Sequence, residues 1–114
     1  KFETGDLCSF NWNNKLLIKR IIAGPGDWVE IDGAGNITVN GELLDEPYAS
    51  EKSLGECDLQ FPIQIGENEY FLVGDHRNTS IDSRSSVIGN VSTDQIIGKV
   101  VFRVWPFDVF GPIK

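Results

Sequence analysis

The chain has 114 residues, of which 40% are hydrophobic and 11% aromatic, which suits one compact domain and excludes both a two-domain architecture and a mainly disordered chain. Its 10 basic and 17 acidic residues give a formal net charge of −7, which argues against a nucleic-acid partner, because such partners are held by neutralising phosphates. No apolar run reaches the roughly 18 residues of a membrane-spanning helix, so we expect residues 1–114 to form one soluble domain.

The chain consists of short runs rich in β-branched and aromatic residues, separated by Gly, Pro and Asn turn signals, which is typical of antiparallel strands. Helical periodicity is nowhere sustained. Asn13-Asn14, residues 32–35 and Asn40-Gly41 predict hairpin turns, so residues 28–44 should form a three-stranded meander. The fold class is therefore all-β. The expected strands are residues 7–12, 15–23, 28–31, 36–39, 42–44, 61–65, 69–73 and 96–105.

Two stretches carry no strand pattern. Residues 45–60 are predicted to be a polar surface excursion, and residues 83–93 a loop with one helical turn near Asp94. Residues 42–58 hold six carboxylates against one base, Lys52, which indicates a solvated loop face. The carboxylates are those of Glu42, Asp45, Glu46, Glu51, Glu56 and Asp58.

The two cysteines and the C-terminal aromatic residues leave alternatives open. Cys8 and Cys57 are too few for a disulfide scaffold and match no zinc spacing, and a bridge between them would join an apolar strand to a polar loop. Trp105, Phe107 and Phe110 form an aromatic-rich stretch that suits either contact with lipid headgroups or, for Trp105, packing in the core.

The strand at residues 15–23 is apolar except for two cations in its middle, Lys19 and Arg20. Period-two alternation places these two side chains on opposite faces of the strand. If both faces are covered, one cation is buried, and a lysine in apolar surroundings loses its proton more readily and can then act as a general base. The alternative is that Lys19 is an edge charge that prevents aggregation.

The segment Gly-Asp-His-Arg-Asn-Thr-Ser-Ile-Asp-Ser-Arg, residues 74–84, directly follows the apolar strand at residues 69–73. Such polar density at the end of a strand is typical of a site loop, although it also suits a hydrogen-bonded turn with surface ion pairs. His76 alone does not predict a metal site, because the chain has no second histidine and no cysteine at ligand spacing.

The order and contents of these segments resemble the bacterial type I signal peptidases, the Ser-Lys enzymes that remove leader peptides from secreted proteins. The resemblance covers nearly the whole chain and implies a partly open antiparallel barrel. The segments that carry it are Gly5-Asp6, Lys19-Arg20, Pro25-Gly26-Asp27 and residues 74–84, and, as in Gram-positive members, Val39-Asn40-Gly41, Asp45-Glu46-Pro47-Tyr48 and residues 98–107.

By this resemblance, Lys19 is the general base and Ser80 supplies the hydroxyl that orients its amine, a task that a hydroxyl performs without adding a charge. Leu17 and Ile18 are expected to help line the small S1 pocket that accepts alanine at the cleavage site. The resemblance implies no metal and no organic cofactor. The resemblance also implies two supporting ion pairs, one between Arg20 and Asp75 and the other between Asp82 and Arg84.

The main departure from the family pattern concerns the nucleophile. The family's serine lies in a Ser-Met-x-Pro-like box before the first Gly-Asp strand, and here only residues 1–4 precede that strand. We therefore expect a catalytic domain that lacks its membrane anchor and serine box and is inactive alone. Ser9 lies in a predicted core strand and is not expected to replace the nucleophile. Smaller departures are Ala23-Gly24 before Pro25, His76 and Thr79.

The function implied by the resemblance is acyl transfer by a serine endopeptidase. The parent protein would be anchored at the extracytoplasmic face of the cell membrane and would remove signal peptides from exported preproteins, which dock by strand addition. The sequence leaves two other functions open. One is a noncatalytic docking or assembly factor of the same superfamily, and the other is an autocleaving repressor-type protease that shares the lysine base.

Overall fold

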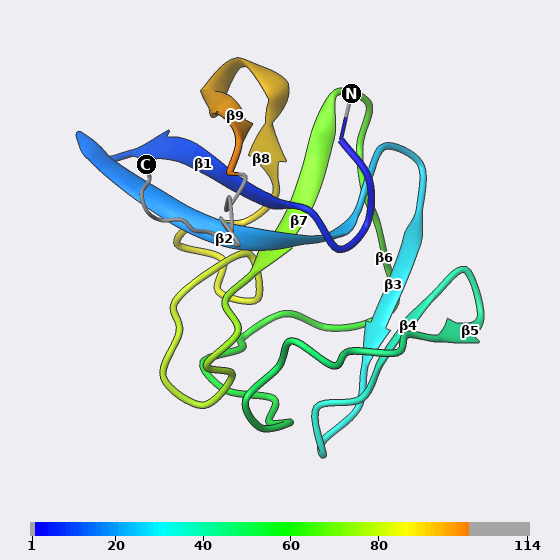
Figure 1. Cartoon of the computed structure of the whole chain (residues 1–114). Helices are drawn as coiled ribbons and strands as arrows, with labels where there is room; N and C mark the ends of the chain where they lie inside the picture. Colours follow the sequence, from blue (N-terminus) through cyan, green and yellow to red (C-terminus); the bar gives the residue numbers. More distant parts are fainter. Residues whose placement is uncertain (1, 101–114) are drawn as a thin grey trace, which may run out of the picture.

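The computed structural model describes residues 2–100, which form two antiparallel sheets and one short 3₁₀ turn (Figure 1). The larger sheet has the order β8-β7-β2-β1-β9 and curls into a half-barrel, and the smaller has the order β5-β4-β3-β6. This architecture confirms the all-β prediction and the partly open barrel. The elements are β1 Leu7–Trp12, β2 Lys15–Ala23, β3 Trp28–Ile31, β4 Ile37–Val39, β5 Glu42–Leu43, β6 Ile63–Gln64, β7 Glu69–Val73, β8 Val91–Ser92, η1 Thr93–Gln95 and β9 Ile96–Lys99.

Two hairpins have the predicted tight turns. β1 pairs with β2 along its whole length, with Trp12 opposite Lys15, and Asn13 and Asn14 between them have φ angles of 53° and 62°. The β4–β5 turn uses Asn40 and Gly41 at 54° and 85°. Positive φ at both central residues matches the right-handed twist of the flanking strands, and Asn and Gly tolerate it best.

Both faces of the C-terminal half of β2 are buried. Ile21 packs with Leu72 in one apolar cluster that also contains Cys8, Phe10 and Val91. On the opposite face, Ile22 packs with residues of the smaller sheet in a second cluster, and Ala23 joins this cluster because the β2–β7 register shifts between Ile21 and Ala23. Two-sided burial explains why this half of the strand is a continuous apolar run rather than an alternating one.

The N-terminal half of β2 is covered much less. Leu16 is 59% exposed and Ile18 is 52% exposed, and β7 pairs with β2 only from Arg20 to Ala23. Lys19 and Arg20 therefore lie at the point where two-sided burial begins. Both are half-buried, and alternation places Lys19 on the face of Ile21 and Arg20 on the face of Ile22.

The shorter strands differ from the predicted bounds. β4, β5 and β6 are shorter than expected because their ladders are only two or three residues long. β8 was not predicted, and it exists because Val91 and Ser92 pair with Tyr70 and Glu69 of β7. The turn near Asp94 is η1. Only the Ile96–Lys99 part of the last predicted strand, and none of Trp105, Phe107 and Phe110, lies within the described residues.

The 45–60 excursion is irregular as predicted, but it is not only a solvated face. Glu46 is 6% exposed, because its carboxylate pairs with Arg77 in the loop after β7. Cys8 and Cys57 are both free. Within residues 2–100 no helix has the length and apolar character needed to cross a membrane.

The two apolar clusters predict a large difference between two leucines. Leu72→Ala should lower the free energy of unfolding by about 2–5 kcal/mol, because it leaves a cavity beside Ile21. Leu43→Ala is the matched control, since Leu43 is 65% exposed, and it should change stability by less than about 0.5 kcal/mol. Urea unfolding measures both values, and equal losses would contradict the described core.

Candidate active site

Two segments meet at the site, the middle of β2 and the loop that follows β7. The Lys19 Nζ donates a hydrogen bond of 2.9 Å to the Ser80 Oγ, although 61 residues separate the two along the chain. They meet because Arg20 lies opposite Val73 in the β2–β7 ladder, so the loop that begins at Gly74 leaves β7 beside Lys19. The structure thus brings together the two residues expected to be the base and its orienting hydroxyl.

The hydrogen-bond chain continues from Ser80 to a buried ion pair. The Ser80 hydroxyl donates to the Asp82 Oδ2 at 2.8 Å. Asp82 is bound on both oxygens by the Arg84 guanidinium, with Nε at 2.8 Å and Nη2 at 2.9 Å, and both side chains are nearly inaccessible. Asp82 also accepts the Gly74 N–H at 2.9 Å. Its carboxylate therefore orients the loop backbone and the serine at once.

The surroundings of Lys19 favour the neutral amine. Burial lowers the pKa of Lys19 below its ordinary value of 10.5, the negative charge of Asp82 opposes this shift, and the positive charge of Arg84 supports it. Within residues 2–100, Lys19 takes part in no ion pair. The amine is hydrogen-bonded to a neutral hydroxyl, and the Asp82 carboxylate that acts on it is paired with Arg84.

Gly74 is a residue of this site that sequence reasoning did not single out. A Cβ at this position would overlap the Ser80 hydroxyl and would lie 3.4 Å from the Lys19 Nζ. Any residue other than glycine would therefore push Ser80 away from the amine. The only sequence signal was the place of Gly74 at the start of the polar segment.

The Lys19–Ser80 pair lies in a cleft of about 570 Å³. Leu17 lines this cleft, but Ile18 does not, because alternation turns Ile18 to the opposite face of β2. Of the two residues expected to line one pocket, only Leu17 shares the cleft with Lys19. The remaining lining residues are Trp12, Lys15, Glu56, Thr79, Ile81, Ser85, Val87 and Ile88.

Arg20 lies on the other face of β2 and forms the expected ion pair. Its Nη2 donates to the Asp75 Oδ2 at 2.6 Å and its Nη1 to the Gly5 carbonyl at 3.0 Å. The guanidinium also stacks 4.3 Å from the centre of the Tyr48 ring, a contact that the sequence did not predict. Burial and the nearby Glu46 carboxylate raise the pKa of Tyr48 to about 12, so the phenol is neutral.

Comparisons with known proteins identify the family of the chain. The family described as "Signal peptidase, peptidase S26" matches residues 1–105. The chain belongs to the signal peptidase family. It is 34% identical to signal peptidase I S of Bacillus subtilis, over 95% of this chain and 62% of the relative. It is 35% identical to signal peptidase IB of Staphylococcus aureus, over 95% and 63%.

A solved signal peptidase I from Enterococcus faecalis has the same fold, with a TM-score of 0.72 and 26% identity, over 89% of this chain and 97% of the solved chain. A probable signal peptidase I-2 of Synechocystis is 35% identical, over 96% of this chain and 51% of the relative. The chain therefore spans between one half and two thirds of the length of these curated relatives.

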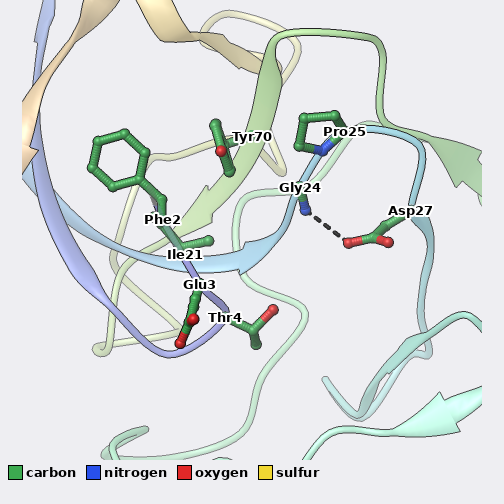
Figure 2. A pocket seen from close by; sticks show the side chains of 8 residues that line it. All are labelled: Phe2, Glu3, Thr4, Ile21, Gly24, Pro25, Asp27 and Tyr70. Carbon is green, nitrogen blue, oxygen red and sulfur yellow. Dashed lines mark hydrogen bonds between the residues drawn. The ribbon is translucent and has the colours of Figure 1, made fainter.

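A second hollow of this signal peptidase-family chain, about 480 Å³, lies between the N-terminal residues and the turn after β2 (Figure 2). Its wall includes Phe2, Tyr70 and the turn residues Gly24 and Asp27. The Asp27 carboxylate is occupied there by the Gly24 N–H and the Asn40 side chain. Because Asp27 already accepts hydrogen bonds from within the protein, this hollow is a weaker candidate for an active site than the Lys19 cleft.

Two further features of residues 2–100 concern metal binding and the Ser9 hydroxyl. No group of three or more His, Cys, Asp or Glu side chains in this part of the chain is arranged to hold a metal ion. Ser9 lies next to Cys8, which is opposite Lys19 in the β1–β2 ladder, so the Ser9 side chain points to the other face. Its hydroxyl donates instead to the Gly98 carbonyl at 3.5 Å.

The lowered pKa of Lys19 predicts a pH dependence of stability with a defined sign. Between the folded-state pKa and the ordinary value of 10.5 the unfolded chain binds more protons than the folded chain. The destabilising contribution of Lys19 is therefore complete below the folded-state pKa and disappears as the pH rises past 10.5. Relative to Lys19→Met, the wild-type free energy of unfolding should rise with pH across this window.

Urea unfolding at a series of pH values measures this difference. Lys52→Met replaces an exposed lysine outside the cleft and is the matched control. A wild-type curve that runs parallel to the Lys19→Met curve across the window would show that Lys19 titrates like an unperturbed lysine.

Proposed function

We propose that this chain is the part of a signal peptidase catalytic domain that carries the general base, and that the full-length protein cleaves signal peptides from exported preproteins with a Ser-Lys dyad. The observation that carries the proposal is the half-buried Lys19 amine, hydrogen-bonded to the Ser80 hydroxyl at 2.9 Å and outside every ion pair of residues 2–100. Burial lowers the pKa of this lysine, so its amine loses a proton more readily than a solvated lysine and can serve as a base.

The proposed reaction is acyl transfer. The neutral Lys19 Nζ accepts the proton of a serine hydroxyl as the serine oxygen attacks the carbonyl of the scissile bond. The ammonium then gives this proton to the leaving amine, and a water molecule, deprotonated by the same amine, hydrolyses the acyl-enzyme. Ser80 contributes by accepting one N–H of the amine, which directs the lone pair of Lys19 away from the loop.

The nucleophile is proposed to come from a part of the full-length protein outside this chain. Two observations support this. The curated relatives extend well beyond the matched region, and in residues 2–100 the only hydroxyl hydrogen-bonded to the Lys19 amine is that of Ser80, which already bonds Asp82. On this proposal the 114 residues alone do not turn over substrate.

The substrate is proposed to bind as an added strand along β2. In the described residues, the Lys15–Lys19 part of β2 pairs with β1 on one side, and β7 reaches only Arg20 on the other. Ile21 bonds backbone groups on the β1 side, so by antiparallel alternation the backbone groups of Leu16 and Ile18 point to the open side. An extended preprotein segment could pair there while Leu17 contacts a small side chain near the scissile bond.

The cellular setting follows from the same proposal. The relatives are named signal peptidases, and signal peptides are removed where preproteins leave the membrane. We place the site at the extracytoplasmic face of the cell membrane, with preprotein signal peptides and the membrane surface as partners of the anchored full-length protein. The proposed chemistry requires neither a metal nor an organic cofactor.

Substitution of the base tests the function. In the full-length protein, Lys19→Ala should reduce cleavage of a preprotein by at least about 10²–10⁴-fold, the usual contribution of a general base. Lys19→Arg should not restore cleavage, because a guanidinium stays protonated. Ser80→Ala should cause a smaller loss, since the amine remains but its orientation is free. Steady-state processing of a purified preprotein measures all three.

Lys52→Ala, at an exposed lysine outside the cleft, is the control and should cleave like the wild type. Full activity of Lys19→Arg would rule out a lysine base. A wild-type protein that binds preproteins without cleaving them would instead support the noncatalytic docking function.

A further inference from the structure

A second buried ion pair, Glu46 with Arg77, lies outside the Lys19 cleft and connects the 45–60 excursion to the loop after β7. The side chains are 0% and 1% exposed. Arg77 donates from Nη1 to Oε1 at 2.9 Å and from Nη2 to Oε2 at 2.7 Å. Burying two charges is costly, so a buried ion pair is weak evidence of a gain in stability. The better hypothesis to test is that the pair fixes one arrangement of the loop.

Arg77 also binds Gly74, the residue that lies next to the Ser80 hydroxyl. Its Nε donates to the Gly74 carbonyl at 2.7 Å, while the Gly74 N–H donates to Asp82 at 2.9 Å. The N–H and the carbonyl of Gly74 are therefore both hydrogen-bonded to side chains. Glycine has the greatest backbone freedom of all residues, so these two bonds restrict the backbone that lies next to the Ser80 hydroxyl.

The 45–60 excursion also contacts Arg20 of β2 through Tyr48. The guanidinium carbon of Arg20 is 4.3 Å from the centre of the Tyr48 ring, and that of Arg77 is 6.0 Å from it. Arg20 is the neighbour of Lys19 on β2. The segment that contains Glu46 and Tyr48 thus contacts both the strand and the loop that together hold the Lys19–Ser80 pair.

We propose that Glu46 is a positioning residue for the Lys19–Ser80 pair, acting through Arg77 and the Gly74 carbonyl. This inference rests on the proposed function of Lys19 as the base. Glu46 does not line the cleft and is not a catalytic residue. Its carboxylate holds the loop in the position in which the Ser80 hydroxyl reaches the amine and the loop shields that amine from water.

Glu46→Gln in the full-length protein tests this role, because it keeps the shape of the side chain and removes the charge. The kcat for preprotein cleavage should fall by about 10- to 100-fold, as expected for a displacement of reacting groups of up to about 1 Å. KM should change by less than about threefold, since the cleft walls are intact. A better hydrated amine has a higher pKa, so the acid limb of the kcat/KM profile should move to higher pH.

Glu42→Gln is the matched control, because Glu42 is an exposed carboxylate on β5 of the same acidic stretch. It should leave kcat and the acid limb unchanged. Arg77→Lys is the second variant, and it tests the positioning role of the Glu46–Arg77 pair if Glu46→Gln does not fold. A lysine keeps the positive charge opposite Glu46 but lacks the planar fork that binds Glu46 and Gly74 together, so it should shift the acid limb in the same direction.

The outcomes separate this inference from the proposed function. If the folded variants keep the wild-type kcat and acid limb while Lys19→Ala is inactive, Glu46 has no positioning role and the lysine base stands. If Lys19→Ala retains activity, the proposed function itself fails. A stability loss in Glu46→Gln with an unchanged pH profile would assign the pair a structural role only.

Discussion

The chemistry of this site depends on how the negative charge of Asp82 is balanced. The hydrogen bonds run from Lys19 through Ser80 to Asp82, and a free carboxylate at that place would keep the amine protonated. Arg84 binds both oxygens of Asp82, which reduces the field at the amine and lets burial dominate the pKa of Lys19. The carboxylate can then orient Ser80 without holding the proton on the lysine.

The position of Lys19 along β2 connects the fold to this balance. Apolar clusters cover both faces of β2 at Ile21–Ala23, and coverage ends within a few residues toward Leu16. An amine placed deeper would be closed to any substrate, and one placed nearer Lys15 would be solvated and charged. At the boundary, one side of Lys19 is desolvated by the core and the other faces the open cleft.

The sequence predicted correctly those strands and contacts that local patterns and ordered motifs encode. β1, β2, β3 and β7 have the predicted bounds, because turn signals and apolar runs mark both ends. The Lys19–Ser80 contact and both ion pairs of Arg20 and Arg84 came from a resemblance of ordered motifs. Glu46 was missed because its partner is 31 residues away and an acidic stretch is usually solvated. The same alternation that separates Lys19 from Arg20 turns the Ile18 side chain away from the cleft that Leu17 lines.

In the loop after β7, Ile81 and Val87 are exposed, so the polar segment around Gly74 and Ser80 is held mainly by hydrogen bonds and ion pairs. Arg77 binds the Gly74 carbonyl, and Arg84 binds the Ser53 and Leu54 carbonyls of the excursion. At Gly55, a Cβ would overlap the Arg77 carbonyl and crowd the Arg84 guanidinium. Arginine suits both positions because its planar fork satisfies a carboxylate and backbone oxygens together. The apolar clusters can tolerate changes of similar volume, whereas this loop depends on charge and hydrogen-bond geometry, which makes the site more sensitive to isosteric substitutions than the core.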